Sequence, residues 1–191
     1  TNGNWTYRGR TEHIINCHIE DVSENHADVV HLRQVHRPCI AAGIDLSKTW
    51  NALWSFSHHA WSASWEPHPA PEEHISTLKL IHSLKIFGKS LAPMDIIFFI
   101  RQIGPGIVYM EFLTVFGKGV FLMSLTPLEP MVQRMVQNIY VSWTYPTVVA
   151  KLFMLADAIQ VERDGMIWNN MKYVGKPVFV KSKVESLISW Q

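Results

Sequence analysis

Two histidines near the start of the chain could bind one metal ion through their imidazole nitrogens. His31 and His36 lie in residues 24–36, where apolar residues recur at helical spacing and predict one continuous helix. On an ideal helix His36 lies about 140° further round than His31, so one ion can reach both only if the helix is locally distorted, as by a π-bulge. Two His and one carboxylate on one face of an iron form the facial triad of non-haem Fe(II) oxygenases. The spacing therefore predicts an iron site that needs a carboxylate from elsewhere in the chain.

Two further polar residues share the predicted helix with these histidines. Asn25 and Asp28 fall in one narrow stripe with His31, and the apolar Leu32 and Val35 belong to the same stripe. The stripe is therefore predicted to point inward. A buried carboxylate without a partner costs several kcal/mol, so we expect Asn25 and Asp28 to be hydrogen-bonded or to hold a metal.

The abundance of histidine weakens this spacing as a signal on its own. With ten histidines in 191 residues, two of them will often lie five apart by chance. Five others have no ligand-like spacing and are interpreted as structural or exposed: His58, His59, His68, His74 and His82.

The middle of the chain predicts an antiparallel sheet, because apolar runs alternate there with glycine-rich turn signals. The predicted strands are residues 74–87, 96–103, 107–116, 120–125 and 131–143. Residues 5–20 predict one or two further short strands. The aromatic-rich residues 47–65 either line a large apolar pocket or belong to the ordinary core of the sheet.

A long helix is predicted from Thr147 to about Tyr173, after Pro146. Its core-facing residues recur at intervals of three and four: Val149, Phe153, Ala156, Gln160, Asp164 and Ile167. Asp157 shares nearly the same face, so periodicity alone does not choose between Asp157 and Asp164 as the missing carboxylate. The predicted fold class is α+β, a helix-grip arrangement of the START and Bet v 1-like type, in which a curved antiparallel sheet packs on a long C-terminal helix.

Four stretches of the sequence resemble a known enzyme family. Asn25-x2-Asp28-x2-His31-x4-His36 resembles the iron-binding helix of Rieske-type oxygenases, and residues 7–10 and 17–25 are similar to the cholesterol 7-desaturase branch, the Neverland family. Residues 160–170 match the closing motif of that family, in which the Asp before x2-Ile-Trp is the third iron ligand. The resemblance thus implies that His31, His36 and Asp164 hold mononuclear Fe(II).

The resemblance also implies an activity and roles for neighbouring residues. The family members are O2- and NAD(P)H-dependent oxidoreductases that convert cholesterol to 7-dehydrocholesterol in steroid hormone biosynthesis. Asn25 would lie close to the metal, and Asp28 would hydrogen-bond a ligand His and bridge to the Rieske centre that delivers electrons. His26 is a departure, because relatives usually carry a small residue there; a third imidazole could alter electron entry or iron affinity.

The likeness covers only the C-terminal catalytic part of a family member. Residues 1–191 are therefore expected to be the iron- and sterol-binding domain, with the Rieske [2Fe-2S] domain elsewhere in the parent protein. Such a cluster needs two Cys and two His, in the family as C-x-H and C-x2-H, and neither Cys17 nor Cys39 fits. The chain begins at Thr1 without Met, which suggests a fragment or a processed product. By resemblance, the full-length protein would be a homotrimer served by a reductase and attached to a membrane through an upstream segment, with the catalytic domain facing the cytoplasm.

Composition excludes some function classes. A net charge of +1 without a basic cluster argues against nucleic acid as a partner. The most apolar run, residues 96–100, is far shorter than the about 20 residues of a membrane-spanning helix. Two cysteines give no disulfide framework, and their simplest interpretation is small buried thiols. Asn4-Trp5-Thr6 fits a glycosylation sequon, a pattern frequent by chance.

Two alternative functions share parts of this pattern. Helix-grip folds also serve non-catalytic sterol and lipid carriers, but a carrier has no use for two His and one Asp on one ion. A zinc hydrolase would use such ligands with a general base beside the metal-bound water, and no HExxH or equivalent is present. Measuring tightly bound iron separates the oxygenase from the carrier.

Overall fold

One curved antiparallel sheet forms the frame of the protein in a computed structural model that describes residues 5–50 and 52–173. Its strands are β1 (Trp5–Ile15), β2 (Ser57–Pro67), β3 (Ile75–Ile86), β4 (Lys89–Ser90), β5 (Ile96–Ile103), β6 (Ile107–Thr114), β7 (Gly117–Glu129) and β8 (Val132–Ser142). Within the described ranges the order is β1-β8-β7-β6-β5-β3-β2, and β4 pairs with β3. All of these pairings are antiparallel, as predicted.

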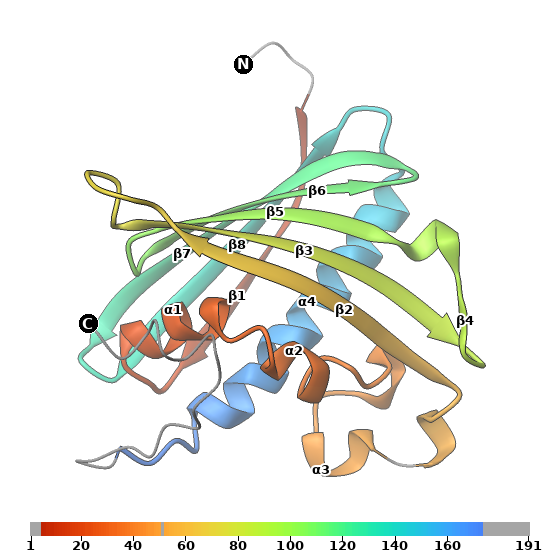
Figure 1. The fold of residues 1–191 in the computed structure, drawn as a ribbon, viewed down its shortest axis with the longest axis horizontal. Coiled ribbons are helices and arrows are strands. Elements are labelled where there is room, and N and C mark those ends of the chain that lie inside the picture. The colour runs from red at the N-terminus through yellow and green to blue at the C-terminus, as the bar shows by residue number, and fades with distance from the viewer. Residues whose placement is uncertain (1–4, 51, 174–191) are drawn as a thin grey trace.

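Helices lie on the concave side of this sheet. They are α1 (Ile19–Ala27), α2 (His31–Gln34), α3 (Leu46–Thr49) and α4 (Thr147–Trp168), with 3-10 turns η1 (Ile40–Ala42), η2 (Ala52–Trp54) and η3 (Ala92–Met94). Figure 1 shows the strands arching over α4, with α1 and α2 on the same side of the sheet. The predicted helix-grip architecture is confirmed, although α4 ends at Trp168 rather than near Tyr173.

The core lies between the sheet and α4. Phe112 on β6 makes an edge-on contact with Phe153 on α4, at 4.6 Å between ring centroids, and Phe121 on β7 packs 5.4 Å from the same ring. Gly119 makes room for this cluster, because a Cβ there would lie only 2.1 Å from the Phe112 ring. The sheet is thereby held close to α4, which carries Asp164.

One expectation from the sequence is wrong, and another concerns a residue that the structure does not describe. Ile167, predicted on the core-facing stripe of α4, is 42% exposed, because it lies in the last turn of the helix. Asn4 of the sequon lies outside the described residues. Among the described residues, no helix is long and apolar enough to cross a membrane.

Candidate metal centre

The helix predicted over residues 24–36 is wrong as a single element, because the chain breaks at Asp28. The Asp28 carboxylate accepts hydrogen bonds from the backbone N–H groups of Val30 at 2.9 Å and His31 at 3.2 Å. The Asp28 side chain thus replaces the backbone carbonyl groups that would accept these hydrogen bonds in a continuous helix, as Asp side chains commonly do in turns. The second helix then ends at Gln34, so that His36 lies beyond it. The end of α2 between His31 and His36, and not a π-bulge, allows both imidazoles to face one point.

The structure brings His31 and His36 together with Asp164. Their ligand atoms all lie within 4.8 Å of one another, so small side-chain movements could place all three on one ion. His36 Nε2 is 3.1 Å from Asp164 Oδ2, and the two histidine rings are 5.1 Å apart. His36 is 5% exposed and Asp164 is 9% exposed. Two of the three side chains are therefore buried and His31 is half-buried, and they come from α2, the segment after α2 and α4.

Hydrogen bonds from the other ring nitrogens fix both imidazoles for metal binding. His31 Nδ1 contacts the backbone carbonyl of Asp28, and His36 Nδ1 lies 2.8 Å from Gln160 Oε1. Both partners are acceptors, so each Nδ1 must carry the proton and each Nε2 keeps its lone pair. Arg163 Nη1 donates to the same Gln160 oxygen at 3.3 Å, which fixes the orientation of that amide. Burial also lowers the pKa of His31, which favours the neutral imidazole.

The Asp164 carboxylate and the Nε2 lone pairs of His31 and His36 point toward the same place. Asn25 Nδ2 donates to Asp164 Oδ2 at 3.1 Å, whereas the buried Asp164 Oδ1 lies 3.1 Å from His36 Nε2 and receives no hydrogen bond from a described residue. A carboxylate and two imidazole lone pairs repel one another unless a positive charge lies between them. The donor set thus fits a cation such as Fe(II), which imidazole and carboxylate ligands suit.

Arg163 anchors the segment that follows His36. It is fully buried and donates to the carbonyl oxygens of Pro38 and Cys39 at 2.8 Å each, and to that of Gly43 at 2.8 and 3.0 Å. The same side chain holds Gln160, so one guanidinium positions both the loop and the partner of His36.

Arg163→Met should destabilise the protein by about 3 kcal/mol or more, because buried carbonyls would lose charge-assisted hydrogen bonds worth about 1.5–3 kcal/mol each. Urea unfolding measures this change. Arg10→Met is the matched control: Arg10 forms an exposed ion pair with Glu12, and its loss should shift stability by no more than about 0.5 kcal/mol. Equal losses in the two variants would contradict the anchoring role.

Asp28 and Asn25 differ in their placement. Asn25 lies beside Asp164 through the amide bond described above. Asp28 is exposed, so its predicted inward orientation is wrong. Its carboxylate turns back to cap the backbone, and its carbonyl, rather than its carboxylate, contacts the ring of His31. The helix break explains this difference, because residues after Ala27 no longer follow the helical stripe.

Asp157 lies outside the group of three. Asp157 is half-buried, and burial of its carboxyl raises its pKa to about 7, while Gln137 and His36 favour the charged form. One of its oxygens, Oδ2, has no hydrogen-bond partner among the described residues. The two candidates left open by periodicity are thus separated by position: only Asp164 reaches the histidine ligand atoms.

Asp157→Asn should remove a pH dependence of stability. The pKa of about 7 in the folded protein lies above the ordinary value of 3.8, so the folded state binds the proton more tightly and the free energy of unfolding falls as pH rises from about 4 to 7. The wild type should lose up to about 4 kcal/mol relative to the Asn variant across this range. Urea unfolding of both metal-free proteins at pH 4.5 and 8 checks this. Parallel pH profiles would show that Asp157 titrates normally.

Sequence reasoning missed several residues around the site. His26 was noted as a departure, and its Nδ1 lies 3.1 Å from the carbonyl oxygen of Val22, while burial lowers its pKa. Trp61 Nε1 donates to the carbonyl of His36 at 3.0 Å, a contact that only the folded sheet creates.

The free thiols of Cys17 and Cys39 are not in the group of three; burial raises the pKa of Cys17 to about 11, as for an inert structural thiol.

The fold and this group of residues define a helix-grip domain with a candidate mononuclear metal centre. The chain belongs to the family described as the 3-ketosteroid 9alpha-hydroxylase C-terminal domain, which it matches over residues 1–188. Relatives include a cholesterol 7-desaturase of Xenopus laevis, 44% identical over 95% of this chain and 40% of the relative. Another, of Ciona intestinalis, is 40% identical over 98% of this chain and 39% of the relative. The resemblance to the cholesterol 7-desaturase branch is thereby confirmed.

A solved structure supports the fold. The chain is similar to a quaternary ammonium Rieske monooxygenase with a TM-score of 0.56, at 10% identity, over 86% of this chain and 39% of that one. At this identity the likeness concerns the fold alone. The chain spans about two fifths of the length of the curated relatives reported above.

Proposed function

We propose that this chain is the catalytic domain of a Rieske-type oxygenase that desaturates cholesterol to 7-dehydrocholesterol. Fe(II) would be held by His31, His36 and Asp164. The observation that carries the proposal is the convergence of these three ligand atoms, with each imidazole oriented through Nδ1 so that Nε2 is free. The relatives named cholesterol 7-desaturase support the sterol as substrate.

The iron, when bound, would supply the activation of dioxygen. The chain's own residues orient and enclose the site. Asn25 holds the Asp164 carboxylate, while Gln160 and Arg163 fix the ring of His36. The enclosed position of His36 and Asp164 limits the access of water. Two neutral imidazoles and one carboxylate leave coordination positions open, as oxygenase chemistry requires.

Electrons would arrive from a Rieske [2Fe-2S] cluster in another domain of the parent protein, supplied by a reductase from NAD(P)H. The exposed carboxylate of Asp28 is suited to meet such a domain, because it is not enclosed with the iron ligands. That the full-length protein is a homotrimer stays a prediction. Attachment to a membrane through a segment upstream of this chain stays a prediction.

Turnover by the parent protein and by the isolated chain tests the electron route. We expect the full-length protein to form 7-dehydrocholesterol over many turnovers with NAD(P)H and a reductase. The 191-residue chain should retain iron yet give no sustained product, because a cluster needs a ligand set that Cys17 and Cys39 do not supply. Many turnovers by the isolated chain would contradict this route. A chain without iron and without turnover in the full-length protein would instead favour a sterol carrier.

A further inference from the structure

A second pair of buried histidines lies outside the candidate metal centre. His59 on β2 and His82 on β3 are 9% and 5% exposed, and His59 Nδ1 is 2.7 Å from His82 Nε2. Of the five histidines interpreted as structural or exposed, these two therefore form a hydrogen-bonded pair inside the protein. The pair comes from neighbouring antiparallel strands, in a register that places Trp61 directly opposite His82.

The other ring nitrogens of the pair have no hydrogen-bond partner. His59 Nε2 and His82 Nδ1 are both buried and unpartnered among the described residues. Burial lowers the pKa of His59 to about 3 and that of His82 to about 4, so both rings are neutral near pH 7. Two neutral rings that share one hydrogen bond keep one N–H and one lone pair at the outer ends. Each outer atom costs about 1–3 kcal/mol if it stays unsatisfied.

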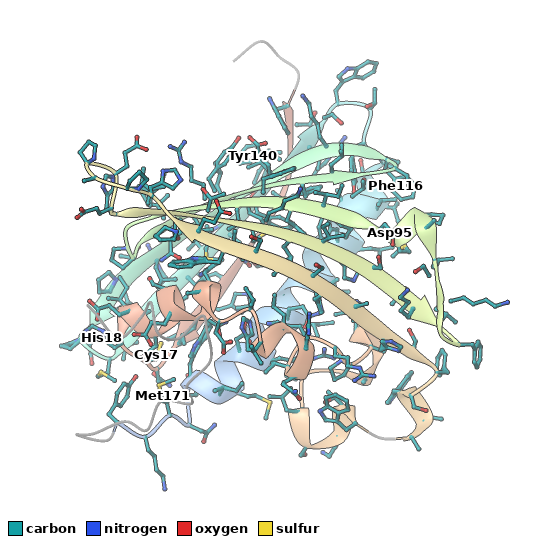
Figure 2. The ribbon with its side chains drawn as sticks, viewed as in Figure 1. Cys17, His18, Asp95, Phe116, Tyr140 and Met171 are labelled. Atoms are coloured by element: carbon teal, nitrogen blue, oxygen red, sulfur yellow. The ribbon has the colours of Figure 1, made fainter. Side chains whose placement is uncertain are left out.

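The surroundings of His82 decide which end carries the proton. Burial is the main influence on the pKa of His82 and lowers it, whereas the nearby backbone of Met94 and the carboxylate of Asp95 raise it. The buried Oδ1 of Asp95 also lacks a partner in the described structure, and Figure 2 shows this residue beside the start of β5. A proton on His82 Nδ1 would suit these two acceptors, and His59 Nδ1–H would then donate to His82 Nε2. The lone pair of His59 Nε2 remains as an acceptor without a donor.

This free acceptor lies close to the metal centre. The Trp61 ring is 6.1 Å from the His59 ring and 6.5 Å from the His36 ring, between centroids. The indole N–H of Trp61 also donates to the carbonyl of His36. One indole thus separates the acceptor from a candidate iron ligand.

We propose that His59 binds the hydroxyl group of the sterol substrate, and that His82 and Asp95 are positioning residues that present its Nε2 lone pair. This proposal rests on the proposed function and names a contact for its substrate. Cholesterol carries a single hydroxyl on the first ring of a rigid skeleton, and carbon 7 belongs to the adjoining ring. A donor held beside Trp61 would therefore fix the reacting carbons near His36. The hydroxyl would also supply the donor that His59 Nε2 lacks among the described residues.

Sterol binding to the iron-loaded, full-length protein tests this contact. Affinities are measured for cholesterol and for cholest-5-ene, which lacks only the hydroxyl. The wild type should bind cholesterol about 3–10-fold more tightly, the range of one neutral hydrogen bond. In His59→Phe this preference should fall to about onefold, since the ring is replaced by one without an acceptor. His58→Phe is the matched control, because His58 is the strand neighbour that points to the opposite face, and it should keep the wild-type preference.

The outcomes separate this proposal from the function on which it rests. If the wild type binds both sterols equally, the hydroxyl contact is wrong, whatever the variants do. If His59→Phe slows turnover of both sterols alike but keeps the binding preference, the pair acts as a proton route or a structural element, and the proposal fails. In either case iron content and product formation can still support the desaturase. Absence of iron and of cholesterol turnover in the wild type would overturn both.

Discussion

His31→Ala, His36→Ala and Asp164→Ala should each abolish the retention of iron by the purified protein. Each change removes one of three converging ligand atoms, and the two that remain leave an incomplete facial set. The loss of affinity should exceed the 10–100-fold that is typical of residues that only orient ligands. Metal analysis after dialysis measures iron per chain, and circular dichroism shows whether the variants keep the fold.

Asp157→Ala is the matched control for this series, because it removes another enclosed carboxylate from the same helix. It should retain wild-type iron. Gln160→Met keeps every ligand but removes the acceptor for His36 Nδ1, and should weaken iron binding by about 10–100-fold. If Asp157→Ala loses iron while Asp164→Ala keeps it, the assignment of the carboxylate ligand is wrong.

Asp28→Asn should leave iron bound and lower turnover of the full-length protein by about 10–100-fold. The amide oxygen of Asn can still accept from the backbone N–H groups of Val30 and His31, so the helix break should persist. The backbone carbonyl that contacts His31 is unchanged by the substitution. The variant therefore removes only the exposed negative charge that is proposed to meet the electron-donating domain.

Steady-state formation of 7-dehydrocholesterol, together with iron content, checks this prediction. Glu20→Gln is the matched control, because it removes another exposed carboxylate from α1 without touching the segment that contains the histidines. Wild-type turnover in Asp28→Asn would exclude Asp28 from electron transfer. A loss of iron in that variant would show that its role is to hold the turn.

Local signals in the sequence were sufficient for the central strands of the sheet, but not for β2, which lies in a stretch that the sequence left open between pocket lining and sheet core. The strand predicted at 96–103 has the bounds of β5, and the glycine-rich turns separate β5, β6 and β7 where they were expected. Such elements depend on turn residues and apolar runs that are neighbours in the sequence. The C-terminal helix was predictable for the same reason, with its start at Thr147 fixed by the preceding proline.

The helix break at Asp28 could not be predicted from periodicity. Apolar spacing runs unchanged through residues 24–36, and only the carboxylate of Asp28 turning back onto the backbone ends the first helix. The Asp28 side chain replaces helical carbonyl groups as the acceptor for backbone N–H groups, and this does not change the spacing of the apolar residues. The apolar spacing therefore indicates a continuous helix where the chain in fact turns.

The residue types and their spacing identify the candidate ligands, but only the packing of the folded chain shows which of them meet. Asp157 and Asp164 share a helix face, but they lie two turns apart, about 10 Å along the axis, and only the docking of α4 against the segment after α2 selects Asp164. The pairing of His59 with His82 depends likewise on the register of two strands, 23 positions apart in sequence. The spacing of residues in the sequence shows to which side of a helix or strand a side chain points. Whether that side chain reaches a metal ligand also depends on its position along the axis of the helix or strand relative to its neighbours, and only the packing of the elements determines that position.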